Sequence, residues 1–176
     1  MGWIELKRRF GWLCVAIAGL LSVGGCSISY KFTGSSIDYN TVKTIQFSDF
    51  PLRSAYVWAP MHAMFNNELV DIYSRQTKLQ QVKRNGDLQL SGEIVEYSQF
   101  NKGVSASGTS SQVQLKLTVN VRFTNNKKHS DDFERKFTAV SEYDSSQQLT
   151  EVQEDLVTEM IKNLTEQIFN ATVANW

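Results

Sequence analysis

The sequence predicts an α+β domain in which a mixed or antiparallel sheet of about four strands packs one face against two amphipathic helices. Three patterns support this fold class. Apolar and polar residues alternate from Val113 to Phe123, apolar residues recur at helical spacing after Pro60, and a similar helical stripe closes the chain. A period of two is typical of a half-buried strand, whereas spacings of three and four residues are typical of a half-buried helix.

The first expected elements are a strand over Thr41 to Phe47 and a helix from Pro60 to about Arg75. Proline suits the first helical position because its missing N–H would have no partner there. The helix carries an apolar stripe: Met61, Phe65, Leu69 and Ile72. Residues Leu79 to Val82 are expected to form a short strand, and Asn85-Gly86 to form a tight hairpin turn with positive φ.

The clearest pattern predicts an antiparallel meander of three strands between Leu88 and Tyr143. In its first strand the apolar phase slips at Ile94-Val95, which indicates a β-bulge. The segment Asn101 to Ser111 is rich in Gly, Ser and Thr and is expected to be a mobile loop, while the polar residues Asn125 to Lys128 suit a turn.

The last expected element is a long helix, in which Thr150 to Gln153 fits a capping box. Acidic residues early in this helix favour the positive end of its dipole. Its predicted buried stripe consists of Val152, Leu156, Met160, Ile161, Leu164 and Ile168.

The N-terminus has the pattern of a lipoprotein signal peptide. Basic residues 7–9 precede an apolar run from Leu13 to Val23, which is too short to span about 30 Å of hydrocarbon as a helix. Val23, Gly24 and Gly25 supply the small side chains that signal peptidase requires before Cys26. We therefore expect cleavage of residues 1–25, acylation of Cys26, a lipidated tether over residues 26–40, and a single domain over residues 41–176.

Composition and cysteine content exclude several classes of function. The chain has 18 basic and 18 acidic residues, and cleavage would remove three basic and one acidic residue, which leaves the mature protein near −2. Nucleic acid is therefore not an expected partner, because its binders carry basic surfaces. Cys14 and Cys26 are the two cysteines, so the domain has no thiol for a disulfide, a zinc ribbon or redox chemistry.

No catalytic or metal site is expected. His62 and His129 are the two histidines, and both fall at positions typical of surface residues, without a nucleophile motif nearby. One face of the predicted sheet is polar and is interpreted either as ordinary solvated surface, which is the commoner case, or as a recognition face: Lys116, Thr118, Asn120, Arg122, Glu134, Lys136 and Thr138.

Taken together, these features resemble the LptE family of lipoproteins. The resemblance covers the mature chain in order and length: a lipobox cysteine, a short tether, Val42 to Ile45 leading to Phe50-Pro51, a helix, the long hairpin and a final helix. Its most particular motif is LQLSGEIVEY at Leu88 to Tyr97. The resemblance implies a non-enzymatic subunit without a cofactor that plugs an LptD-type β-barrel as a 1:1 heterodimer and assists lipopolysaccharide transport.

The resemblance also implies a location and a set of contacts. No aspartate follows Cys26 at residues 27–29, which favours the outer membrane with the domain on the periplasmic side. Basic residues of the family contact lipid A phosphates, and the positions nominated here are Arg122, Lys127 and Lys128. Two alternatives stay open: another outer-membrane lipoprotein that activates a peptidoglycan synthase or belongs to a secretion pore, and a hydrolase, which the missing nucleophile and base disfavour.

Overall fold

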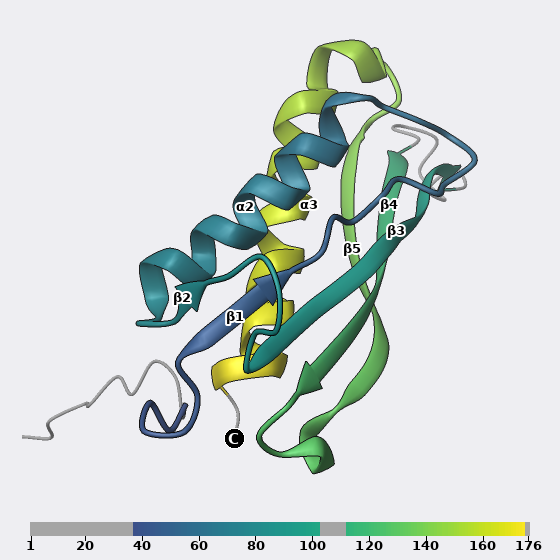
Figure 1. Cartoon of the computed structure of the whole chain (residues 1–176). Helices are drawn as coiled ribbons and strands as arrows, with labels where there is room; N and C mark the ends of the chain where they lie inside the picture. Colours follow the sequence, from purple (N-terminus) through teal and green to yellow (C-terminus); the bar gives the residue numbers. More distant parts are fainter. Residues whose placement is uncertain (1–36, 103–111, 175–176) are drawn as a thin grey trace, which may run out of the picture. The chain divides into compact units, whose positions relative to one another are not determined.

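The computed structural model describes residues 37–102 and 112–174, and their elements are shown in Figure 1. The strands are β1 (Thr44–Phe47), β2 (Gln80–Gln81), β3 (Leu88–Asn101), β4 (Gln112–Asn125) and β5 (Phe133–Asp144). The helices are α2 (Pro60–Gln76), α3 (Leu149–Phe169), a short 3-10 turn at His129–Asp131 and a π-helical turn at Asn170–Ala174. The predicted signal peptide, the predicted acylation site Cys26 and residues 26–36 of the predicted tether lie outside the described residues.

The strands form one mixed sheet in the order β2-β1-β3-β4-β5. Strand β1 pairs in parallel with both β2 and β3, whereas β3, β4 and β5 form the predicted antiparallel meander. The α+β class is confirmed, with five strands rather than about four. No helix within the described residues is long and apolar enough to cross a membrane.

Both helices pack on the apolar face of the sheet. The alternating residues of β4 from Val113 to Phe123 are buried, and they share one core with Phe65 of α2 and Ile168 of α3. Aromatic rings link the layers, since Tyr73 makes edge contacts with Phe47 and with Phe169 at centroid distances of 5.2 and 5.1 Å. Of the helices in residues 37–102 and 112–174, none lies on the other face of the sheet, which carries mainly polar side chains.

The predicted hairpin at Asn85-Gly86 is wrong. Asn85 does adopt a positive φ of 56°, but β2 and β3 do not pair, because β1 lies between them. Gly86 is required by packing against β1: an added Cβ would lie 2.7 Å from the backbone nitrogen of Gln46. The turn therefore carries the chain past β1 rather than back along β2.

The predicted bulge in β3 is confirmed. The register with β4 shifts between Ile94 and Glu96, which keeps both Ile94 and Tyr97 on the buried face. Gly92 precedes the bulge, where an added Cβ would lie 2.1 Å from the carbonyl oxygen of Asn120. The first strand is shorter than the predicted Thr41 to Phe47, because Thr41 instead closes a turn on the carbonyl of Asp38.

The final helix and its apolar stripe are confirmed, but the predicted cap is wrong. Helix α3 begins at Leu149, and its N-cap Gln148 makes no side-chain capping bond. Gln153 and Val157 are buried, whereas Val152 and Leu156 are partly buried. The buried Gln153 has a polar partner, since its amide donates to the Tyr97 hydroxyl at 2.9 Å. Of the predicted loop after Asn101, residues 103–111 lie outside the described residues.

Candidate functional site

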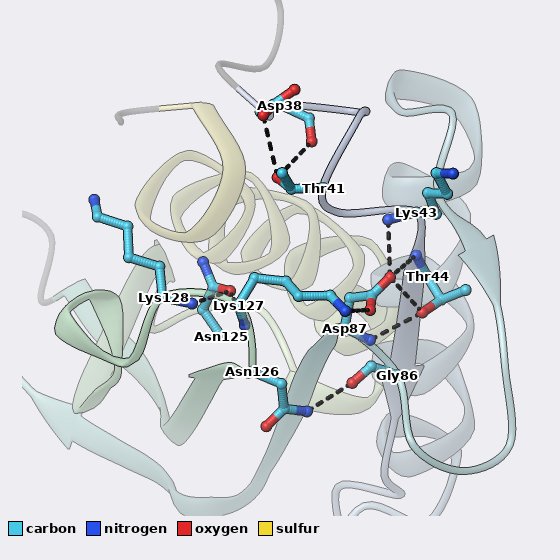
Figure 2. A network of polar contacts seen from close by, with 10 residues as sticks. All are labelled: Asp38, Thr41, Lys43, Thr44, Gly86, Asp87, Asn125, Asn126, Lys127 and Lys128. Atoms are coloured by element: carbon cyan, nitrogen blue, oxygen red, sulfur yellow. Dashed lines mark hydrogen bonds and ion pairs between the residues drawn. The ribbon is translucent and has the colours of Figure 1, made fainter.

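A dense polar network lies at the end of the sheet where β1 and β3 begin and β4 ends (Figure 2). Its centre is Asp87, which the turn at Asn85-Gly86 delivers to the start of β1. One carboxylate oxygen of Asp87 accepts from the backbone N–H groups of Lys43 and Thr44 at 2.9 and 3.0 Å, and from the Thr44 hydroxyl at 2.9 Å. The other oxygen pairs with the Lys127 ammonium at 2.9 Å.

These contacts govern the ionisation of Asp87. Partial burial on its own raises the pKa of the carboxyl, but the Lys43 N–H, the Lys127 ammonium and the Thr44 donors together hold that pKa well below its ordinary value of 3.8. Asp87 is therefore a fixed negative charge that ties β1, β3 and the β4–β5 connection together.

The β4–β5 connection is ordered by its own polar side chains. The Asn125 side-chain oxygen accepts from the backbone N–H groups of Lys127 and Lys128 at 2.9 and 3.1 Å. The Asn126 amide donates to the Gly86 carbonyl at 2.7 Å, and the Lys128 ammonium pairs with Asp131 at 2.9 Å. The predicted polar turn is confirmed, and it continues into the 3-10 turn at His129–Asp131.

A cleft of about 500 Å³ opens beside this network. Its apolar wall includes Ile37, Val42 and Leu88, and the charged residues of its rim are Lys127, Lys128, Asp38 and Asp131. The ammonium of Lys127 pairs with Asp87 and that of Lys128 with Asp131. An apolar wall with a rim of paired charges is chemically suited to an amphiphile, and an anionic group on it would compete with the aspartates for the two ammonium groups. The structure thus brings two of the three nominated basic residues to one cleft.

Arg122 does not belong to the cleft. It lies on the helix-free face of the sheet with 66% of its side chain exposed, and its guanidinium donates twice to Glu134, at 3.0 and 2.8 Å. Because Arg122 and Phe123 are neighbours in a strand, their side chains point to opposite faces, and Phe123 is buried under the helices.

The helix-free face, which we call the open face, is defined by the side chains of Glu96, Lys116, Thr118, Arg122 and Glu134. Its charges are paired across strands: Lys116 with Glu96 at 2.9 Å, as well as Arg122 with Glu134. Thr118 donates to Glu96 at 3.1 Å and contacts the Thr138 hydroxyl at the same distance. The bond from Lys116 is the main cause that lowers the pKa of Glu96. The pKa of Glu134 is lowered by the Asn120 amide, which donates to it at 2.9 Å, and by Arg122.

The two histidines contact different aspartates. His62 contacts Asp49 at 3.0 Å near the start of α2, and His129 contacts Asp132 at 3.0 Å in the 3-10 turn. Within residues 37–102 and 112–174, no group of three His, Cys, Asp or Glu side chains could hold a metal ion.

Sequence reasoning missed Asp87, although one signal was present. Its place directly after Asn85-Gly86 fixes it next to a turn, but its partners at Lys43 and Lys127 are about 40 residues away in either direction. The polar network therefore became visible only in the folded chain.

Several solved structures are similar to this chain. Similar solved structures include a minor lipoprotein from Acinetobacter baumannii (19% identity, 73% of this chain and 90% of that chain, TM-score 0.47). They also include rare lipoprotein B from Shewanella oneidensis (16%, 72% and 92%, 0.44) and a neuraminyllactose-binding hemagglutinin homolog from Helicobacter pylori (11%, 80% and 88%, 0.51). At these identities the likeness concerns the fold alone.

The sequence comparisons are more specific. The comparison with curated proteins gives no match. A family model described as LptE, lipopolysaccharide-assembly, matches residues 42–172, which include every strand and both long helices. The chain therefore belongs to the LptE family of lipopolysaccharide-assembly lipoproteins.

Proposed function

We propose that this protein is the lipid-anchored, non-enzymatic subunit that occupies the lumen of an LptD-type β-barrel in a 1:1 complex and assists lipopolysaccharide transport to the outer membrane surface. Family membership supports the general role in lipopolysaccharide assembly. The lumen position is supported chiefly by the open face, whose cross-strand ion pairs make a polar, ordered and nearly neutral surface. The interior of a membrane barrel is polar, so such a surface can face it without burying unpaired charge.

We further propose that the N-terminal segment attaches this domain to the membrane. Residues 1–25 would be removed by a signal peptidase that recognises Val23, Gly24 and Gly25, and acylation of Cys26 would anchor residues 26–40 as a tether. Several acyl chains on one residue hold a protein on a membrane stably, and the tether raises the effective concentration of the domain near a barrel in the same membrane.

Lys127 and Lys128 are the proposed contacts for lipopolysaccharide phosphates. They border the cleft of about 500 Å³, whose apolar wall lies next to their ammonium groups. Phosphate binding would exchange their aspartate partners for the ligand. Arg122, on the open face, would form a separate contact, because it lies on the other side of the sheet from the cleft wall.

The proposed function is tested by mild detergent extraction of the full-length protein, carrying a C-terminal tag, from its native membrane. We expect a much larger barrel protein to co-purify at a 1:1 ratio by quantitative mass spectrometry, and Cys26→Ala to abolish acylation of the tagged chain. Recovery of the wild-type chain only as a free monomer, or with a peptidoglycan synthase or a secretion pore, would contradict the proposal.

The lipid contact has its own test. Binding of purified lipopolysaccharide to the detergent-solubilised chain is compared for Lys127→Ala, Lys128→Ala and, as a matched control, Lys162→Ala on α3. We expect weaker binding with the first two variants and unchanged binding with the third. Equal binding by all three variants would exclude the cleft lysines.

A further inference from the structure

The outer edge of β5 carries backbone groups that no strand of this sheet pairs. Strand β5 stands last in the order β2-β1-β3-β4-β5, and it is 12 residues long. It is hydrogen-bonded to β4 along one edge, without a register shift. Long unpaired edges are sites where further strands add, unless the protein blocks them.

The hydrogen-bond pattern identifies which groups point outward. The Lys102 N–H donates to the Gln112 carbonyl, so the backbone groups of Gln112 point towards β3. Because the direction of the N–H and C=O groups alternates along a strand, even-numbered residues of β4 bond to β3 and odd-numbered residues bond to β5. The register pairs odd residues of β4 with odd residues of β5, for example Val119 with Phe137. The even-numbered residues of β5 therefore direct their N–H and C=O groups away from the sheet: Glu134, Lys136, Thr138, Val140 and Glu142.

One contact confirms this assignment and shows that the edge is accessible to a donor. The side-chain amide of Gln167 on α3 donates to the outward carbonyl of Thr138 at 3.4 Å, which is a long hydrogen bond. Within residues 37–102 and 112–174, no other side chain donates to the outward carbonyls of Lys136, Thr138 or Val140. Val140 is an exposed apolar side chain at the middle of this edge, with 54% of its surface accessible.

Two hollows lie in line between this edge and α3. One, of about 440 Å³, is lined by Arg135, Phe137 and Gln167 among others, and the next, of about 190 Å³, by Thr138–Ser141 together with Glu159 and Met160. A row of outward N–H and C=O groups with side-chain hollows beside it is the geometry that accepts an extended peptide as an added strand.

The charges beside the edge indicate the composition of the added strand. Arg135 stacks over the Phe133 and Phe137 rings, at 4.5 and 5.2 Å from their centroids, and Lys136 is exposed beside it. Glu159 lines the other hollow. An extended segment with an acidic residue near Arg135, a small or apolar residue near Val140 and a basic residue near Glu159 would complement this edge.

We propose that the outer edge of β5 binds an extended segment of the barrel partner, which adds to the sheet as a sixth strand. This inference rests on the proposed function, because the edge is continuous with the open face that would lie against the lumen. In the complex, the added strand pairs with the outward N–H and C=O groups of Lys136, Thr138 and Val140. The bond from the Gln167 amide to the Thr138 carbonyl is then replaced by a bond from a backbone N–H of the added strand.

Val140→Pro tests the proposal, with Val140→Thr as the matched control. Proline removes an outward N–H and adds bulk at the edge, but it leaves the bonds of β5 to β4 intact, and edge strands tolerate it for that reason. We expect the amount of barrel that co-purifies with tagged Val140→Pro to fall about five- to tenfold, and Val140→Thr to behave as wild type. Equal recovery with folded Val140→Pro would overturn the strand proposal.

Amide hydrogen exchange of the wild-type chain decides the case even if Val140→Pro does not fold. We expect the amides of Lys136, Thr138 and Val140 to exchange at least about tenfold more slowly in the purified complex than in the free chain. Unchanged exchange in a complex that contains the barrel would overturn the strand proposal alone. A wild-type chain that captures no barrel would overturn the proposed function and this inference together.

Discussion

The two faces of the sheet are built on opposite principles. On the helix side, buried residues such as Leu117 and Val119 pack against α2 and α3, and this face supplies the hydrophobic free energy of folding. On the open face, Arg122 and Glu134 form an exposed ion pair and Lys116 and Glu96 a half-buried one, and such solvent-accessible pairs contribute little to stability. The difference teaches that the open face is not needed to hold the fold together, so it is available to meet a partner.

The largest loss of stability is expected from Phe65→Ala in the core. Phe65 is fully buried on α2 and lies against Phe50, with ring centroids 5.4 Å apart. Its removal leaves a cavity and should lower the free energy of unfolding by about 3–5 kcal/mol in urea titrations. Asn67→Ala, at an exposed position of the same helix, is the control; similar losses in both variants would contradict the assigned core.

Gly92→Ala should be the next most damaging change. The added Cβ would lie 2.1 Å from the Asn120 carbonyl oxygen and 2.5 Å from the Phe50 ring, and backbone cannot move aside easily. We expect a loss of about 2–3 kcal/mol in the same titrations. Ser91→Ala, one residue earlier in β3, should cost much less, and wild-type stability of Gly92→Ala would refute the close approach of β3 and β4.

Asp87→Asn should have an intermediate effect on stability. Asp87 links β1, β3 and the β4–β5 connection at one end of the sheet. The amide can keep some of the hydrogen bonds but loses the attraction to Lys127, so we expect a loss of about 1–2 kcal/mol at neutral pH. Asp87 is 18% exposed, so solvent screening weakens this pair less than the open-face pairs.

Asp87 should also make the stability of the fold decrease as the pH falls. The pKa of Asp87 is lower in the folded chain than its ordinary value of 3.8, so the unfolded chain binds the proton more readily. Its contribution to stability is therefore complete above about pH 4 and is lost as pH falls towards the folded pKa. Urea midpoints measured between pH 6 and pH 2 should fall less steeply for Asp87→Asn than for wild type; parallel curves would exclude this role.

Arg122→Ala should have the smallest effect on stability. Arg122 and Glu134 are both largely exposed, so breaking their pair should leave the urea midpoint unchanged within error. The same variant should reduce recovery of the barrel if the open face meets it. A clear loss of stability would show that the open face, too, is structural.

The fold was largely predictable because its strongest signals are local. The alternation from Val113 to Phe123 identifies β4, and the slip at Ile94-Val95 identifies the bulge. The insertion of β1 between β2 and β3 was not predictable, because β1 has four residues and its parallel partners are set by distant contacts. In α3, a polar residue, Gln153, takes a buried position that an apolar stripe cannot reveal.

The candidate site was predictable only in part. Lys127 and Lys128 could be nominated from a basic turn, but their cleft depends on Ile37, Val42 and Leu88, which folding brings together. Arg122 could be placed on a polar strand face, whereas its bonds to Glu134 follow from the register between β4 and β5. Such pairings across strands have no fixed sequence spacing.

Site-specific photocrosslinking in the native membrane tests most directly whether the open face meets a barrel. A photoreactive amino acid replaces Arg122 on the open face, and a second variant carries it at Asn67 on α2. We predict that the Arg122 position crosslinks to the barrel protein in high yield. A barrel adduct from the Asn67 position with none from the Arg122 position would contradict the assignment of the open face.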